Sequence, residues 1–460
     1  MNNEHDKLRE VSWNELFRWL LLLRAVRIAL LARVLVLGAA GLIFTTLGWW
    51  GINYLFSASQ DPVIRGEAWQ TTMSDWLWNT SPEFSILTSA RSADALFLHV
   101  ATGLAEAPVS LWLFLTRPFI NLFHGELTPI GFVYFALCGI WELFVWGLFG
   151  GAITRIAALK FTRDEAPDLP GALRHSASKI MSYSMAPMLA LGGAAVFGIQ
   201  LAILGWIMRL GFLAMFAGFV WPFVLLLGLL MAILLIGALA GWPLMWATVG
   251  VEGTDAFDAL SRSYAYTYQK PLRLLWYALL VVILAAVSMF IVKLFATSAI
   301  ALGNWSVSWG LDEPTYRQLV SPRSVAPPAP AELAPSLEAT VPPPVEGALA
   351  NAGDDRVPTT VQTPPASLAG TRWLAAKAIR FWKSLLGALA AGYQAGFLFV
   401  AAVGVYLLLR KDVDGAEMDE VYVEDEPEFG MPPLADEHVT GVPEVHSDLA
   451  AAPESSTASL

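Results

Sequence analysis

One carboxylate lies deep within an apolar stretch of the sequence and is the first candidate for chemistry. Glu142 occurs in CGIWELFVWG, where an ionised side chain is costly unless it is paired or hydrated. A carboxylate in this position is typical of a proton or cation site, and a protonated, hydrogen-bonded Glu that fixes helix packing is the alternative. Gln200 and Gln394 are expected at a similar depth, where they would line a cavity or bond across helices. The three residues form a candidate intramembrane polar site.

Two segments that follow apolar stretches carry basic and tyrosine side chains of the kind found at the membrane surface. Lys and Arg are attracted to anionic headgroups, and Tyr is enriched where the bilayer meets water. We therefore predict an interface or lipid-headgroup role, with a plain anchor as the simpler interpretation and direct headgroup recognition as the more specific one. The residues are Arg174, Lys179, Arg262, Tyr264, Tyr266, Tyr268 and Lys270.

The sequence offers no constellation for catalysis. Its six histidines show no ligand spacing, and a single cysteine, Cys138, excludes a site built from several cysteines. The sequence has no G-x-S-x-G elbow, P-loop or dinucleotide fingerprint, and His124-Gly125-Glu126 lacks the Pro-Cys-x-x-Cys partner of a deaminase. We therefore expect a non-enzymatic protein with no catalytic residues, no metal, no cofactor and no nucleic-acid partner.

The elements that must position these residues are membrane helices. The 460 residues are 56% apolar and 15% charged, whereas a soluble domain has about 25% charged residues. About 20 helical residues cross roughly 30 Å of hydrocarbon, and only helices satisfy their own backbone there. We predict an all-α polytopic membrane helix bundle of about six transmembrane helices, with interfacial amphipathic helices and a disordered linker and tail. The spans are expected at 34–56, 129–151, 185–208, 217–247, 274–298 and 386–409, and 129–298 forms a four-helix core.

The basic residues orient the chain. Residues 1–33 hold 6 Lys and Arg, and the segments 152–184 and 248–273 hold 5 and 3. This excess of Lys and Arg in short segments predicts that these segments, and both termini, lie in the cytoplasm. Residues 411–460 hold 14 Asp and Glu but one base, Lys411, so 410–460 is predicted to be an acidic cytoplasmic tail that is disordered and able to bind a cytoplasmic protein.

Three further segments are expected at the membrane surface or outside it. Residues 1–33 predict an interfacial helix whose arginines lie among headgroups. Residues 57–128 predict an outer segment that follows the membrane surface, with an extra span within 94–123 as the alternative. Residues 299–371 predict a Pro/Ala-rich disordered outer linker, because 321–370 hold 11 of the 28 prolines.

Two long runs leave the path of the chain open. Residues 212–249 are uncharged and too long for one straight crossing, and Pro222 and Pro243 predict an interfacial entry, a span and an interfacial exit. A tight hairpin within 209–249 is the alternative. Residues 372–409 are expected to form a second interfacial helix that leads into the last span.

An internal repeat aligns the two predicted inner loops at an offset of 87 residues. In each copy an acid precedes an ALxxS helix, and an Asp near the helix start suits the positive end of the helix dipole. The alignment predicts two parallel units, built from the second with the third span and the fourth with the fifth. The pairs are Glu165 with Glu252, Asp168 with Asp255, Ala172 with Ala259, Leu173 with Leu260, and Ser176 with Ser263.

Small residues recur at four-residue spacing, which permits close approach of helices. We expect tight packing within the chain, with dimerisation as the secondary possibility. The sets are Gly147 with Gly151, Ala194 with Gly198, Gly237 with Gly241, and Ala388, Gly392 and Gly396.

The stretch WPLMWATVGVEGTDAFDALSRSYAYTYQKPLRLLWYALL, with the later YLLLRKDVDGAEMDEV, resembles an uncharacterised family of bacterial, planctomycete-type polytopic inner-membrane proteins. The short helix and the span after it are distantly similar to the membrane domain of glycerophosphodiester phosphodiesterases, without their catalytic domain. The resemblance implies a multi-pass protein of the bacterial inner membrane and supplies no catalytic residues.

Two functions follow as hypotheses. The first is a non-enzymatic membrane scaffold, accessory or lipid-interacting protein whose partners are the bilayer and other membrane proteins, since the informative residues concentrate at interfaces. The alternative is a transporter or its membrane subunit, with Glu142 in the path and Gln200 and Gln394 beside it.

Overall fold

The computed structural model describes residues 17–59, 64, 108–123, 127–165, 167–209, 211–320, 371–418, 420–422, 434–435 and 444–445. The chain divides into two units, Met1–Glu420 and Val421–Leu460. In the described part of the second unit, β1 (Leu434–Ala435) and β2 (Glu444–Val445) form a minimal antiparallel pair. Every other described element is helical.

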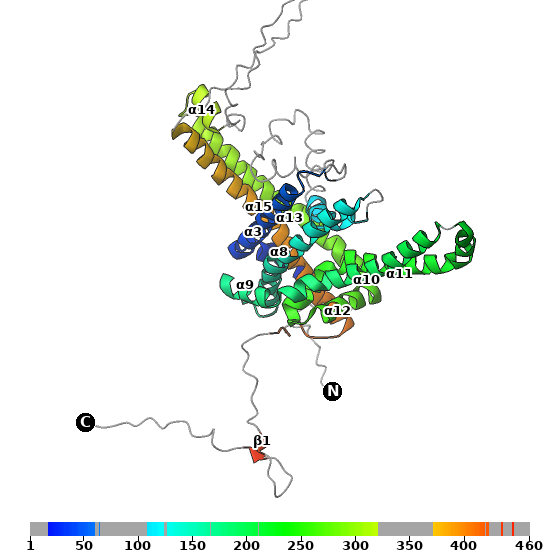
Figure 1. Ribbon diagram of the computed structural model, residues 1–460. Coiled ribbons are helices and arrows are strands. Elements are labelled where there is room, and N and C mark those ends of the chain that lie inside the picture. The colour runs from blue at the N-terminus through cyan, green and yellow to red at the C-terminus, as the bar shows by residue number, and fades with distance from the viewer. Residues whose placement is uncertain are drawn as a thin grey trace, which may run out of the picture. The chain divides into compact units, whose positions relative to one another are not determined.

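Six described helices are long and apolar enough to cross a membrane, which confirms an all-α polytopic bundle (Figure 1). The chain is a multi-pass membrane protein. The helices are α3 (Ala32–Leu55), α8 (Pro129–Thr162), α10 (Ile180–Ile207), α11 (Gly211–Glu252), α13 (Pro271–Ser308) and α15 (Thr371–Val413).

Shorter helices connect or cover the spans: η1 (Arg18–Leu20), α2 (Leu21–Ala29), α9 (Leu169–Ser178), α12 (Ala256–Gln269) and α14 (Glu313–Val320). Residues 108–121 are also helical. At 1.5 Å per residue that helix is about 21 Å long, too short to cross the hydrocarbon. Within the described residues there is thus no seventh span, and residues 94–107 lie outside them.

The last span is the centre of the bundle. Helix α15 contacts α2, α3, α8, α11 and α13. In its apolar window 89% of the residues are buried, against 11% to 50% in the other five spans. Its contact with α3 is made by backbone: a Cβ on Gly38 would clash with the carbonyl group of Gly392. The small residues of α15 therefore serve packing within the chain.

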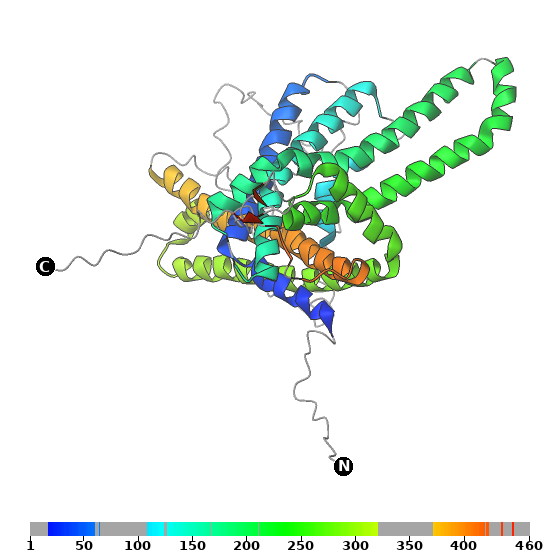
Figure 2. The same cartoon turned by 90° about the horizontal axis from the view of Figure 1, so that it is seen from below.

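The fourth apolar run is one helix. Helix α11 continues through Pro222 and Pro243 for 42 residues, about 63 Å, so the alternative of a tight hairpin is wrong, and the interfacial entry and exit stay predictions. Proline is tolerated in membrane helices because neighbouring groups and local adjustments satisfy the freed carbonyl. Helices α10 and α11 run side by side and project from the bundle as an arm (Figure 2).

Three predicted boundaries also move. Helix α13 continues to Ser308 and α14 follows, so the first part of the expected linker 299–371 is helical. Helix α15 runs unbroken from Thr371, without a separate interfacial helix before the span. The first unit extends to Glu420, so the start of the predicted tail belongs to the bundle. Residues 321–370 and most of the tail lie outside the described residues.

The segments predicted to share one membrane face do meet. Arg18 pairs with Asp412 at 3.3 Å, joining the N-terminal helix to the end of α15. Arg24 donates to the Lys160 carbonyl oxygen at the end of α8, at 3.1 Å. The arginines expected among headgroups are thus engaged in part with carbonyls and carboxylates of the protein.

Candidate functional site

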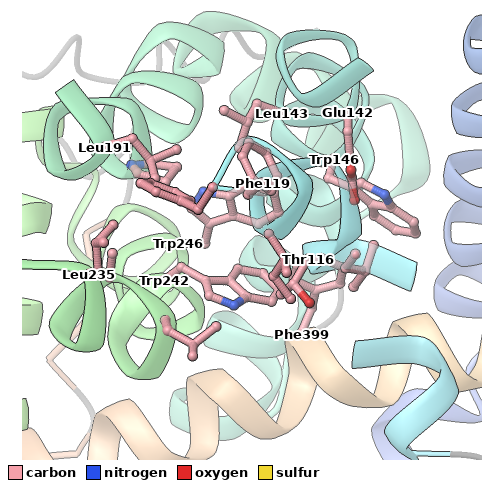
Figure 3. A pocket seen from close by; sticks show the side chains of 16 residues that line it. Thr116, Phe119, Glu142, Leu143, Trp146, Leu191, Leu235, Trp242, Trp246 and Phe399 are labelled. Atoms are coloured by element: carbon pink, nitrogen blue, oxygen red, sulfur yellow. The ribbon is translucent and has the colours of Figure 1, made fainter. Parts of the chain in front are cut away.

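An apolar cavity of about 200 Å³ lies between α8, α10, α11, α15 and the helix 108–121 (Figure 3). Helices α8, α10, α11 and 108–121 each contribute residues three or four positions apart, the spacing that places side chains on one helix face, and α15 contributes Phe399. The lining residues are Leu115, Thr116, Phe119, Ile120, Phe123, Glu142, Leu143, Trp146, Pro187, Leu191, Leu235, Ala238, Leu239, Trp242, Trp246 and Phe399.

Aromatic stacking holds the wall of the cavity together. Phe399 of α15 lies 5.3 Å from Trp246 of α11, with nearly parallel rings, and 5.2 Å from Trp146 of α8. Trp242 lies 5.5 Å from Trp246 in an edge-to-face arrangement. These separations are in the favourable range for aromatic pairs, so three spans share one aromatic cluster.

Three polar atoms in this wall have no hydrogen-bond partner within the described part of the chain. They are Glu142 Oε2, Trp146 Nε1 and Trp242 Nε1, all buried. Trp246 differs, because its Nε1 donates to the Tyr183 carbonyl oxygen at 2.8 Å. A buried group without a partner forfeits the hydrogen bonds that it makes with water, so these atoms are available to a ligand.

The predicted three-residue polar site is not assembled. Glu142 is 2% exposed and lines the cavity, whereas Gln200 and Gln394 are absent from its lining. Gln200 is exposed on α10, and Gln394 is half-buried in α15. The position of a residue along an apolar run predicts its depth in the membrane but not the direction in which its side chain points, so the sequence placed these residues at the same level without showing that they face different surroundings.

The three tyrosines of α12 contact protein rather than forming a row toward headgroups. Tyr264 donates to the Leu234 carbonyl oxygen at 2.6 Å, and Tyr268 to that of Ile233 at 2.5 Å. Tyr266 is buried and donates to Asp414. Burial raises the pKa of Tyr264 to about 12. The predicted interface role is therefore wrong for Tyr266, which is buried between α12 and the end of α15. Tyr264 and Tyr268 bond α12 to α11 and are at least partly exposed, so their interface role stays a prediction.

Arg262 belongs to a charged cluster that the sequence did not predict. We call Glu252, Arg262, Tyr406 and Arg410 the Glu252 cluster. Glu252 Oε2 lies 2.5 Å from Arg262, its Oε1 lies 3.2 Å from Arg410, and Tyr406 donates to Oε1 at 2.5 Å. Burial lowers the pKa of Arg262, but the Glu252 and Asp258 carboxylates outweigh it and raise that pKa overall.

A second carboxylate contacts three side chains from two other helices, η1 and α13. Asp412 pairs with Arg18 and with Arg273 at 2.8 Å, and accepts a hydrogen bond from Tyr277 at 3.0 Å. Both clusters lie at the exit of α15, where the sequence reads RKDVDG. The only signals in the sequence were the acid aligned in the repeat and the charges directly after the last span.

The other predicted interface residues remain near the surface. Arg174 is exposed, and Lys179 and Lys270 are partly exposed at the C-terminal ends of α9 and α12. A positive side chain at the C-terminal end of a helix is stabilised by the negative end of the helix dipole. The contact of these three residues with lipid headgroups stays a prediction.

In both copies of the repeat the aligned serine donates to a carbonyl oxygen of the preceding span, although the two acceptors are not aligned positions. Ser176 of α9 donates to the Gly147 carbonyl oxygen of α8 at 2.7 Å, and Ser263 of α12 donates to that of Gly241 of α11 at 2.7 Å. Asp168 and Asp255 are the N-cap residues of the two short helices. The packing of the spans does not repeat in the same way, because α10 packs against α8 and α11, whereas α13 packs chiefly against α15. The two parallel units therefore stay a prediction.

A search against known protein families, curated proteins and solved structures found no match for the chain. The resemblance to the inner-membrane family therefore remains a prediction. Within the described residues, no group of three His, Cys, Asp or Glu side chains is placed to hold a metal ion.

Proposed function

We propose that this protein is a non-enzymatic, lipid-interacting membrane protein that holds an apolar lipid chain in the cavity of its helix bundle. The observation that carries the proposal is the cavity itself, which is lined by aromatic and aliphatic side chains from five helices. A site of this kind, apolar with few polar groups, is the usual form of a pocket for a hydrophobic ligand. The charged clusters at one end hold the surrounding helices in place.

A transport role is the second candidate, and the observation in its favour is that Glu142 lines the cavity. A path for ions or polar solutes needs polar side chains along its length. Gln200 and Gln394 do not supply them at this cavity. The geometry thus favours lipid binding over transport.

We further propose that the protein lies in the bacterial inner membrane with both termini in the cytoplasm. The test is accessibility of single cysteines in a Cys138→Ala background, because Cys138 is the one native cysteine and is buried. Thr340→Cys should react with an impermeant maleimide on intact spheroplasts, and Gly430→Cys only after permeabilisation. The opposite pattern would contradict the orientation.

Filling the cavity should displace the lipid chain. Ala238 lines the cavity and is buried, so Ala238→Phe places a ring where the chain would lie. We expect about tenfold less crosslinking of a phospholipid that carries a diazirine in its acyl chain, measured on the purified full-length protein.

Leu229→Phe is the matched control, because Leu229 is on the same helix and its side chain is exposed. This variant should crosslink as the parent protein does. Equal crosslinking of parent and Ala238→Phe would place the lipid outside the cavity and refute the proposal.

A further inference from the structure

We propose that the cavity recognises a lipid by a hydroxyl group, through the paired side chains of Glu142 and Trp146. This inference rests on the proposed lipid-binding function and names its ligand class: a neutral, apolar molecule that carries one free hydroxyl. Diacylglycerols and long-chain alcohols share this chemistry.

The pair is built into one helix face. Glu142 and Trp146 are four residues apart on α8, so their side chains lie on consecutive turns. They are 2% and 1% exposed, and both line the cavity, where Figure 3 shows them on the same side. Glu142 Oε2 and Trp146 Nε1 have no partner among the described residues.

The hydrogen-bonding capacities of the pair select the ligand group. An indole N–H only donates, and a carboxyl oxygen accepts. A hydroxyl has one donor and two acceptor positions, so a single hydroxyl satisfies both side chains. An ester or ether oxygen satisfies the indole alone, and an ammonium satisfies the carboxyl alone.

The other residues of the cavity wall determine the chemical character of the rest of the ligand. Apart from Glu142 and Thr116 its residues are aliphatic or aromatic, and Thr116 already donates to the Trp112 carbonyl oxygen at 2.8 Å. A charged headgroup would be buried here without a counter-ion, at a large cost. Trp242 Nε1, which also has no partner in the ranges that the structure describes, offers a donor to an ester carbonyl.

The test compares alcohols with their acetyl esters on the full-length protein in phosphatidylcholine nanodiscs. The ligands are dioctanoylglycerol, its acetyl ester, dodecanol and dodecyl acetate, and bound ligand is counted by native mass spectrometry. We expect each alcohol to bind about tenfold more tightly than its ester. In Glu142→Leu this preference should fall to about one while affinity for the esters is kept, because only the hydroxyl donates to the carboxyl. In Trp146→Phe the alcohols and the esters should both bind more weakly, because both accept from the indole.

Trp276→Phe is the control, since Trp276 is exposed on α13 and should leave the preference unchanged. Tighter binding of dioctanoylglycerol than of dodecanol would assign the source to diacylglycerols, and the reverse order to simple alcohols. Equal binding of alcohols and esters, or a preference that survives Glu142→Leu, would overturn the hydroxyl inference and leave lipid binding intact. If none of the ligands binds, or if Ala238→Phe does not reduce their binding, the proposed function is refuted instead.

Discussion

Gly392→Leu is expected to prevent recovery of the folded protein. A Cβ on Gly392 would lie 2.5 Å from the Leu35 carbonyl oxygen and 2.6 Å from the Ala39 amide nitrogen of α3. Both atoms belong to helix backbone, so no side-chain rotation relieves the clash, and α3 and α15 must separate. Because overpacking of deformable cores already costs about 1–3 kcal/mol, we expect a loss of more than about 3 kcal/mol. Size-exclusion chromatography and thermal unfolding of the detergent-solubilised protein measure it.

Gly387→Leu on the same helix is the control. A Cβ on Gly387 has no atom within 4 Å, so the same substitution five residues earlier should leave the chromatographic peak and the melting temperature nearly unchanged. If the two variants behaved alike, the contact between α3 and α15 would not be as close as described.

The second large effect is expected from Glu252→Leu. The substitution leaves Arg262 and Arg410 without the carboxylate that they share, and removes the acceptor of Tyr406. The side chains of Glu252 and Arg410 are only 10% and 13% exposed, so water compensates little. Removing one member of a buried charge pair costs about 3–5 kcal/mol, and the more exposed Arg262 reduces this to about 3 kcal/mol. Thermal unfolding should report the loss.

Glu165→Leu tests whether the position or the charge matters, because Glu165 is the exposed counterpart of Glu252 in the repeat. Its effect should stay within about 0.5 kcal/mol. In a double-mutant cycle, Glu252→Leu and Arg410→Leu together should cost less than the sum of the two single substitutions. Strict additivity would show that the two side chains do not interact.

The sequence predicted the spans well because a span requires only length and apolar character. It also predicted that the small residues would pack within the chain, as Gly392 does against α3. The rotation of each helix about its own axis was harder to predict. Most spans are apolar on every side, so periodicity did not show that Glu142 would line the cavity while Gln200 would be exposed.

Long-range pairing was the second missing part. Glu252 and Arg410 are far apart in the sequence, and both were assigned to a surface where free charges are normal. Only the packing of α11 against α15 shows that they share a contact. The contacts of the tyrosines of α12 were not predicted for a related reason. Aromatic enrichment at the membrane surface does not distinguish a ring in lipid from one that bonds a neighbouring helix, as Tyr264 does.

The central position of α15 has a consequence for biosynthesis. The ribosome makes this helix last among the spans, after the residues that follow α14. The five earlier spans therefore enter the bilayer while the place that α15 fills is still empty. Association of the native bundle, and closure of the cavity wall by Phe399, must await the insertion of the final helix. Assembly of the bundle thus finishes after the spans have been threaded into the bilayer, and not span by span as they emerge.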